Sequence, residues 1–179
     1  MKSKKNEVKL MIYSSLFTGL IIIGSYISIP TGIVPIVFAN FFIFLASLIL
    51  EKEWAFLSLF IYILLGAVGL PVFSGAVGGL HHIYGPTGGY LIGYIVAAYI
   101  IAFISGNKKT IFKDTIALLS GALAIHILGI FWLAVKFPEG WQNIYNIYWV
   151  FILGDLVKIS LALYCIKYIR KYLANSIND

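Results

Sequence analysis

Charged residues are scarce in this chain. Of its 179 residues only 11% are Asp, Glu, Lys or Arg, whereas soluble domains carry about 25%. Hydrophobic residues make up 61%, against roughly 45–50% in a soluble domain, and the mean hydropathy is +0.96. A soluble core of this size cannot bury so much apolar surface. The composition therefore excludes a soluble protein and predicts that much of the surface faces lipid.

Cysteine and the common catalytic motifs are also missing. The single Cys165 excludes an intrachain disulfide, and because it lies in an apolar run we interpret it as a packing residue. No phosphate-binding Gly-x-x-x-x-Gly-Lys-Ser/Thr motif, nucleophile elbow or His-Glu-x-x-His helix is present. His81 and His82 have no further metal ligands at suitable spacing. We therefore predict neither an enzyme nor a metal or cofactor site.

What the chain does contain is a series of apolar runs, and a spanning helix needs about 20 apolar residues. The runs are Leu10–Ile29, Val34–Leu50, Trp54–Leu70, Tyr90–Ser105, Thr115–Val135 and Ile147–Tyr168. We predict an all-α integral membrane protein in which residues 1–179 form one domain of six transmembrane helices. The first run is too long for the apolar part of a signal peptide, and no small-residue cleavage site follows it.

The basic residues predict the orientation of this bundle. An even number of spans places both termini on one side of the membrane. Eleven of the thirteen Lys and Arg residues would lie on that side, in the tails and even-numbered turns, against one, Lys136, on the other: Lys2, Lys4, Lys5, Lys9, Lys52, Lys108, Lys109, Lys113, Lys167, Arg170 and Lys171. Because cytoplasmic segments are enriched in basic residues, both termini are predicted to be cytoplasmic. Topology thus accounts for the net charge of +6, and we predict no binding to nucleic acid.

One acidic and one basic residue lie within the sixth run. Asp155 and Lys158 are three residues apart and share one helix face. Each charge near the bilayer middle costs about 2.5–3.5 kcal/mol, and such residues typically face a wet cavity and serve a function. A carboxylate only accepts hydrogen bonds and an ammonium group only donates them, so the pair would fit a urea-like group, with N–H toward Asp155 and C=O toward Lys158. A structural ion pair between helices is the alternative.

A glycine-rich loop joins the third and fourth runs. Residues 69–90 contain seven glycines and two prolines but no Asp, Glu, Lys or Arg. Non-helical backbone at membrane depth is tolerated where protein buries it or where it lines a cavity, and glycine lets the backbone approach a ligand closely. We predict an outer loop that covers a pocket open to the outside. A flexible connector is the alternative.

Several stretches match a single family. Gly-Leu-Pro-Val-Phe at 69–73 and Gly-Pro-Thr-Gly-Gly-Tyr-Leu at 85–91, followed by Gly93, resemble the signature of BioY, the biotin-specific S-component of energy-coupling-factor (ECF) transporters. Weaker similarities are Gly-Asp-x-x-Lys at 154–158, Ile29-Pro30, Val34-Pro35-Ile36 and Gly129-x-x-Trp132-Leu133-Ala134. The chain departs from the family pattern at Ala39, where Gln is usual, at Ala76, where Gly is usual, and at Leu153, where Pro often stands.

The resemblance implies a multi-pass subunit of the cell membrane that captures biotin from outside with high affinity. A separate module, a transmembrane T subunit with two ATPase subunits, would drive import, and biotin would be a transported ligand rather than a cofactor. The ligand-binding residues expected on this basis are Asn40, Phe73, Ser74, Gly79, Tyr84, Thr87, Tyr90, Tyr94, Trp132, Asp155 and Lys158. Each aromatic residue among them has an alternative role in ordinary bundle packing.

The first helix provides a candidate docking surface for the T subunit. Ser14 with Thr18, and Ser15 with Gly19, form small-x-x-x-small pairs that allow close helix contact in lipid. They resemble the Ala-x-x-x-Ala face through which S-components dock. Packing within the bundle is the alternative.

Two other functions stay open. A self-sufficient proton-coupled vitamin transporter could use Asp155 and Lys158 as a proton relay. An intramembrane enzyme could use His126 with Asp155, although we interpret His126 as a buried, hydrogen-bonded packing residue.

Overall fold

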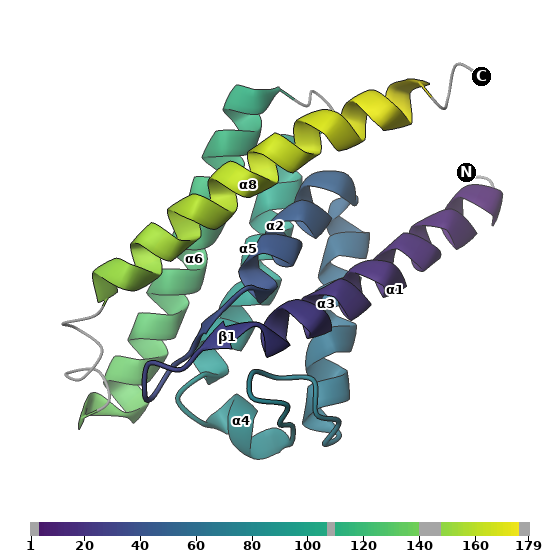
Figure 1. The fold of residues 1–179 in the computed structure, drawn as a ribbon. Coiled ribbons are helices and arrows are strands. Elements are labelled where there is room, and N and C mark those ends of the chain that lie inside the picture. The colour runs from purple at the N-terminus through teal and green to yellow at the C-terminus, as the bar shows by residue number, and fades with distance from the viewer. Residues whose placement is uncertain (1–3, 107–109, 140–147, 176–179) are drawn as a thin grey trace.

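The computed structural model describes residues 4–106, 110–139 and 148–175. Within these ranges the chain forms seven helices and one two-stranded hairpin (Figure 1). In order they are α1 (Lys4–Tyr26), β1 (Ser28–Ile29), β2 (Ile36–Val37), α2 (Ala39–Ile49), α3 (Lys52–Ala67), α4 (Leu80–Tyr84), α5 (Gly88–Ser105), α6 (Ile111–Lys136) and α8 (Tyr148–Asn175). The fold is mostly helical, as the apolar runs predict.

Four of the described helices are long and apolar enough to cross a membrane. These segments are Asn6–Tyr26, Gly88–Ser105, Ile111–Lys136 and Tyr148–Lys171, so the chain is a multi-pass membrane protein. The prediction of six spans is confirmed only in part. The 11 residues of α2 rise about 16 Å and the 16 residues of α3 about 24 Å, less than the roughly 30 Å of a hydrocarbon core. Of the residues behind the orientation, Lys2, Lys108 and Lys109 lie outside the described ranges.

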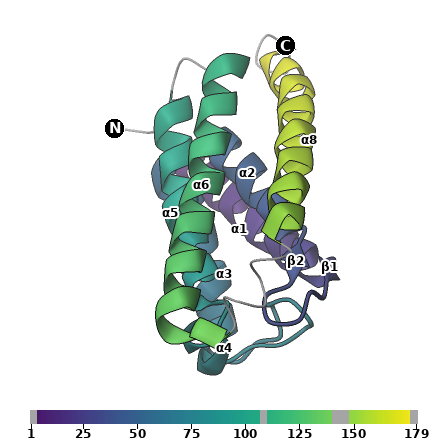
Figure 2. The same cartoon turned by 90° about the vertical axis from the view of Figure 1, so that its left-hand side faces the viewer.

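The bundle has two distinct ends. The first turn of α1 and the last turn of α8 lie at one end, whereas the β1–β2 hairpin and α4 lie at the other (Figures 1 and 2). Helices α5 and α6 run side by side over much of their length (Figure 2). Glycine permits this contact: a Cβ on Gly93 would lie 2.9 Å from Cα of Ile125, and one on Gly129 would lie 2.4 Å from the ring of Tyr90.

The connection between α1 and α2 differs from the prediction. The sequence analysis takes the second helix to begin at Val34, but α2 begins at Ala39 and the preceding residues form the hairpin. Ser28 pairs with Val37 and Ile29 with Ile36. Proline lacks a backbone N–H and disfavours helical geometry in the residue before it, so Pro30 and Pro35 keep this segment extended. The hairpin lies at the end of the bundle that carries α4 (Figure 1).

A buried ion pair closes the other end of the bundle. Asp114 on α6 is fully buried and accepts hydrogen bonds from both terminal nitrogens of Arg170 on α8, with Nη2 3.1 Å from Oδ1. The hydroxyl of Ser105 also donates to Asp114, at 2.7 Å, and Arg170 donates to the Leu48 carbonyl at 3.4 Å. The cluster links α2, α5, α6 and α8. This cluster was not predicted from the sequence because its members are far apart in the chain.

Replacing Arg170 with methionine tests this cluster. Asp114 would remain as a buried carboxylate without its cation, which typically costs about 3 kcal/mol or more. We expect a clearly lower melting temperature for Arg170→Met in detergent. The matched control is Lys171→Met, because Lys171 is the exposed neighbour and surface substitutions usually change stability by less than about 0.5 kcal/mol. Equal melting temperatures for the two variants would show that the ion pair contributes no net stability.

Two of the four residues assigned to the docking surface lie inside the bundle. Ser14 and Thr18 are buried and face α3, where their hydroxyls donate to the carbonyls of Trp54 at 3.2 Å and Ser58 at 3.0 Å. Both are therefore packing residues, and their assignment to an exposed docking face is wrong. Their small size serves the contact between α1 and α3.

The other two docking residues lie on the outer side of α1. Ser15 is exposed and Gly19 is half-buried. A Cβ on Gly19 would meet no atom within 4 Å, so the space beside this residue is open. The structure thus reduces the candidate docking surface to Ser15 and Gly19.

Candidate functional site

A cavity of about 330 Å³ lies at the end of the bundle that carries the hairpin and α4. Its walls come from α1, the hairpin segment, α2, α3, the glycine-rich loop, α5, α6 and α8. Eight of the eleven predicted ligand-binding residues line it: Asn40, Phe73, Ser74, Thr87, Tyr90, Tyr94, Asp155 and Lys158. The fold thus brings residues from distant parts of the chain around one space.

Asp155 is the centre of a polar cluster at this cavity. The carboxylate is 4% exposed, and Lys158, 7% exposed, donates to its Oδ1 from 2.8 Å. Asn40 on α2 donates through Nδ2 to Oδ1 at 3.2 Å and to Oδ2 at 3.4 Å. His126 on α6 places Nε2 3.1 Å from Oδ2. Three helices therefore converge on one carboxylate, and its position is held by three donors.

Some polar atoms of the cavity lining have no hydrogen-bond partner within the described parts of the chain. They are Oδ1 of Asn40, the hydroxyl of Tyr90 and Nδ1 of His126, all of them buried. Buried polar groups are nearly always hydrogen-bonded, and an unmatched one is costly. His126 is therefore more than the fully bonded packing residue of the sequence analysis. A ligand that both donates and accepts hydrogen bonds would complement this lining.

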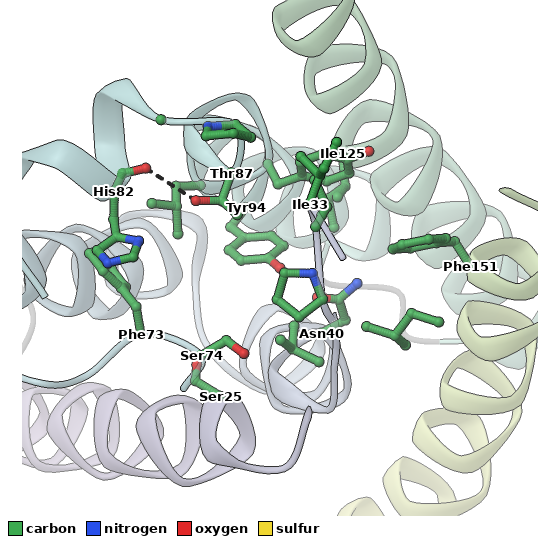
Figure 3. A pocket seen from close by; sticks show the side chains of 18 of the residues that line it. Ser25, Ile33, Asn40, Phe73, Ser74, His82, Thr87, Tyr94, Ile125 and Phe151 are labelled. Atoms are coloured by element: carbon green, nitrogen blue, oxygen red, sulfur yellow. Dashed lines mark hydrogen bonds between the residues drawn. The ribbon is translucent and has the colours of Figure 1, made fainter. Parts of the chain in front are cut away.

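Aromatic and aliphatic side chains form the rest of the cavity. Phe73 from the loop lies on one side and Phe151 from α8 on the other, with Tyr94 between them (Figure 3). Ile33 and its neighbours in the hairpin segment close a further side. Such walls suit the apolar body of a small ligand.

Several lining residues were not predicted from the sequence. Ser25 and Tyr62 bond to each other at 2.8 Å across α1 and α3, and neither was singled out. His81 and His82 were considered only as metal ligands. His126 was named only as a packing residue or as part of an enzyme site, although a polar residue within a membrane span is a functional candidate by default.

Three predicted residues do not line the cavity. Trp132 instead donates its indole N–H to the Gly85 carbonyl at 2.9 Å and so supports the loop from α6. Tyr84 is 65% exposed on α4. Gly79 has a φ of +105° and donates its backbone N–H to Gly66 at 2.6 Å, so its role is to shape the loop. The glycine-rich loop and α6 thus contain residues that support the wall of the cavity as well as residues that line it.

Comparison with known proteins identifies the family. The model of the BioY family matches residues 1–175, which is nearly the whole chain. The chain belongs to the BioY family. The biotin transporter BioY of Thermotoga maritima is 37% identical over 152 residues, covering 85% of this chain and 90% of that protein. The probable biotin transporter BioY of Pyrococcus horikoshii is 38% identical over 159 residues, covering 89% and 93%.

A solved crystal structure has a similar fold. The S-component for biotin from an ECF-type ABC transporter superposes with a TM-score of 0.86 at 29% identity, covering 96% of this chain and 95% of that one. The BioY relatives are named as transporters, not as enzymes. The resemblance that the sequence motifs indicated is therefore confirmed, and the chain is a transport protein with an S-component fold.

Proposed function

We propose that this chain is the biotin-binding S-component of an ECF-type importer in the cell membrane. The observation that supports the proposal is the Asp155 cluster, which lines a cavity that the glycine-rich loop helps to form, in a member of the BioY family. Biotin combines a cyclic urea, an apolar bicyclic body and an acidic tail. The polar cluster of the cavity matches the cyclic urea, and its apolar walls match the bicyclic body.

The polar cluster fits the ureido group of biotin. Lys158 uses one of its three N–H groups on Asp155, which leaves donors for the ureido carbonyl. The free lone pairs of Asp155 and the unmatched Oδ1 of Asn40 can accept the ureido N–H groups. Asn40 also holds Asp155 in place, and Tyr94 and Phe151 pack around the ring system in this arrangement. The residues proposed to bind biotin are therefore those that line the cavity.

Titration of the purified protein against a panel of vitamins tests this proposal. We expect one biotin to bind per chain, and riboflavin, thiamine and folate to give no heat, since none of them carries a saturated cyclic urea with two N–H groups on a small apolar ring. Saturable binding of another vitamin in place of biotin would overturn the ligand assignment. Binding of no vitamin would overturn the function.

The chain is proposed to work with a separate motor, a T subunit and two ATPase subunits, since no phosphate-binding motif is present in its sequence. Reconstitution of the chain alone in vesicles separates this from a proton-coupled transporter. We expect biotin binding but no uphill uptake when a proton gradient is imposed. Uphill uptake without ATPase subunits would favour the second mechanism.

The proposed topology has six membrane crossings and two cytoplasmic termini. In this topology α2 and α3 are short crossings that flanking residues extend. In a Cys165→Ser background, Ser74→Cys should react with an impermeant maleimide added outside right-side-out vesicles. Glu53→Cys, at the other end of the bundle, should react only after permeabilisation. The reverse pattern would invert the orientation.

A further inference from the structure

The cavity has a second polar region at its mouth. His81 and His82 on α4 line it together with Ser74 of the preceding loop. Figure 3 shows His82 and Phe73 on the opposite side of the cavity from Phe151, with Tyr94 in between. The lining therefore combines the two imidazoles of α4 with the Asp155 cluster of α8, and Tyr94 lies between the His82 side and the Phe151 side. Its form matches a ligand with two polar ends.

The His82 side chain is held by contacts with the loop. Its ring centroid lies 4.2 Å from that of His81 and 6.1 Å from that of Phe73. The hydroxyl of Thr87 donates to the His82 carbonyl at 3.1 Å and fixes the turn between α4 and α5 (Figure 3). His81 is exposed and His82 half-buried, so both imidazoles stand where the cavity meets water.

The charged residues that line the cavity determine the orientation in which an acidic ligand binds. At the inner end a ligand carboxylate would meet Asp155 as well as Lys158, whose charge Asp155 already compensates at 2.8 Å, so this end gives it no net attraction. At the mouth the carboxylate keeps part of its hydration, and an imidazole can donate an N–H to it whether neutral or protonated. We infer that His81 and His82 form a carboxylate subsite that receives the acidic tail of the ligand. This inference rests on the proposed function and assigns the residues that contact the acidic tail of the ligand.

A carboxylate subsite made of imidazoles links binding to pH. Burial, and then the neighbouring His81, lowers the pKa of His82 in the free protein. A bound carboxylate favours the protonated ring and raises that pKa again, so binding takes up protons. The affinity for the acid should therefore increase as the pH falls from 8 to 6, while the carboxylate itself stays ionised.

Other titratable groups also line the cavity and can contribute to the pH dependence of binding. Comparison with a neutral ligand cancels this contribution. The groups are Tyr62 on α3, Tyr90 and Tyr94 on α5, His126 on α6, and Asp155 and Lys158 on α8. Biotin and its carboxamide share the ureido and ring contacts and differ only at the tail. The ratio of their affinities therefore isolates the mouth of the cavity.

The test is titration of biotin and of biotin carboxamide into the parent and into His81→Gln/His82→Gln, at pH 6 and pH 8. We expect the parent to prefer the acid by about three- to tenfold at pH 6 and by less at pH 8. The double variant should prefer it by less than about twofold at both pH values. Titration in two buffers of different ionisation enthalpy should show proton uptake for the acid only.

Three results would count against the inference. They are equal affinity of the parent for acid and amide, an acid preference that survives in the double variant, and the same proton uptake for both ligands. If neither compound binds the parent, the proposed function fails as well, so the two failures are distinguishable. The melting temperature reports whether the double variant folds, and His81→Gln alone, on the exposed ring, serves if it does not.

Discussion

Asp155→Asn is expected to weaken biotin binding by about 10- to 150-fold, the equivalent of about 1.5–3 kcal/mol for hydrogen bonds to a charged group. The carboxylate accepts hydrogen bonds from Lys158, Asn40 and His126. An amide of the same shape loses the charge and turns one oxygen into a donor that faces other donors. The change therefore affects direct contacts to the ligand and the positions of the residues around it. Isothermal titration with purified variants measures the loss.

Lys158→Met is expected to lose a similar factor. The variant keeps most of the volume of the stem but removes the donor proposed for the ureido carbonyl. Each single variant also leaves one buried charge without its partner, so its melting temperature should fall. The double variant Asp155→Asn/Lys158→Met removes both charges and should recover part of that stability without recovering the affinity. This separation of stability from affinity distinguishes a ligand site from a structural ion pair.

Asp114→Asn is the matched control for these variants. It also removes a buried carboxylate that is bonded to a basic residue, but at the end of the bundle away from the cavity. We expect lower stability with unchanged biotin affinity. If Asp155→Asn and Lys158→Met fold and bind biotin as the parent does, the pair is merely structural and the ligand contacts must lie elsewhere.

Gly19→Leu is expected to leave biotin binding intact and to abolish most uptake. No atom lies within 4 Å of a Cβ at this position, so the fold tolerates a side chain there. A leucine would hold a partner helix away from α1 where the proposed contact with the T subunit needs a small residue. We expect uptake by cells that contain the complete transporter to fall by at least about tenfold, or about 1.4 kcal/mol of assembly free energy. Co-purification of the T subunit should fall in parallel.

Ser160→Leu is the control for bulk on a lipid-facing surface. Ser160 is exposed on α8, and its hydroxyl donates to the carbonyl of Leu156 on the same helix, at 2.9 Å. Uptake by this variant should match the parent. Lost biotin binding with normal assembly in Gly19→Leu would instead place this face of α1 inside the bundle. Normal uptake would move the docking surface to another helix.

The sequence alone predicted the membrane class, the family and part of the site. The composition is sufficient to predict the membrane class, because an excess of apolar residues has to face lipid wherever the helices lie. Asp155 and Lys158 could be paired in advance because a separation of three residues places them on one face of any helix. The loop residues Phe73 and Thr87 could be placed at the cavity because they belong to the two loop motifs, and Ser74 directly follows the first of these motifs.

The tertiary structure alone decided which faces of the helices turn inward. In a soluble helix the apolar stripe marks the buried face, but a helix in lipid is apolar all round. On α1, Ile21 is fully buried and Ile23 is 55% exposed, so residue type does not distinguish the two faces. For this reason Ser14 and Thr18 could not be told apart from Ser15 and Gly19 by sequence.

Several polar contacts could not be predicted for the same reason, because residue type does not show which face of a membrane helix turns inward. Asn40 and His126 meet Asp155 from α2 and α6, and Arg170 meets Asp114 across the far end of the bundle. These contacts depend on how each helix is rotated about its axis, and that rotation is set by close packing around residues such as Gly93. The sequence alone determined the composition of the helices and the positions of the charged residues along them. Only the packing of the bundle determined which of those charges meet, and so where the cavity lies.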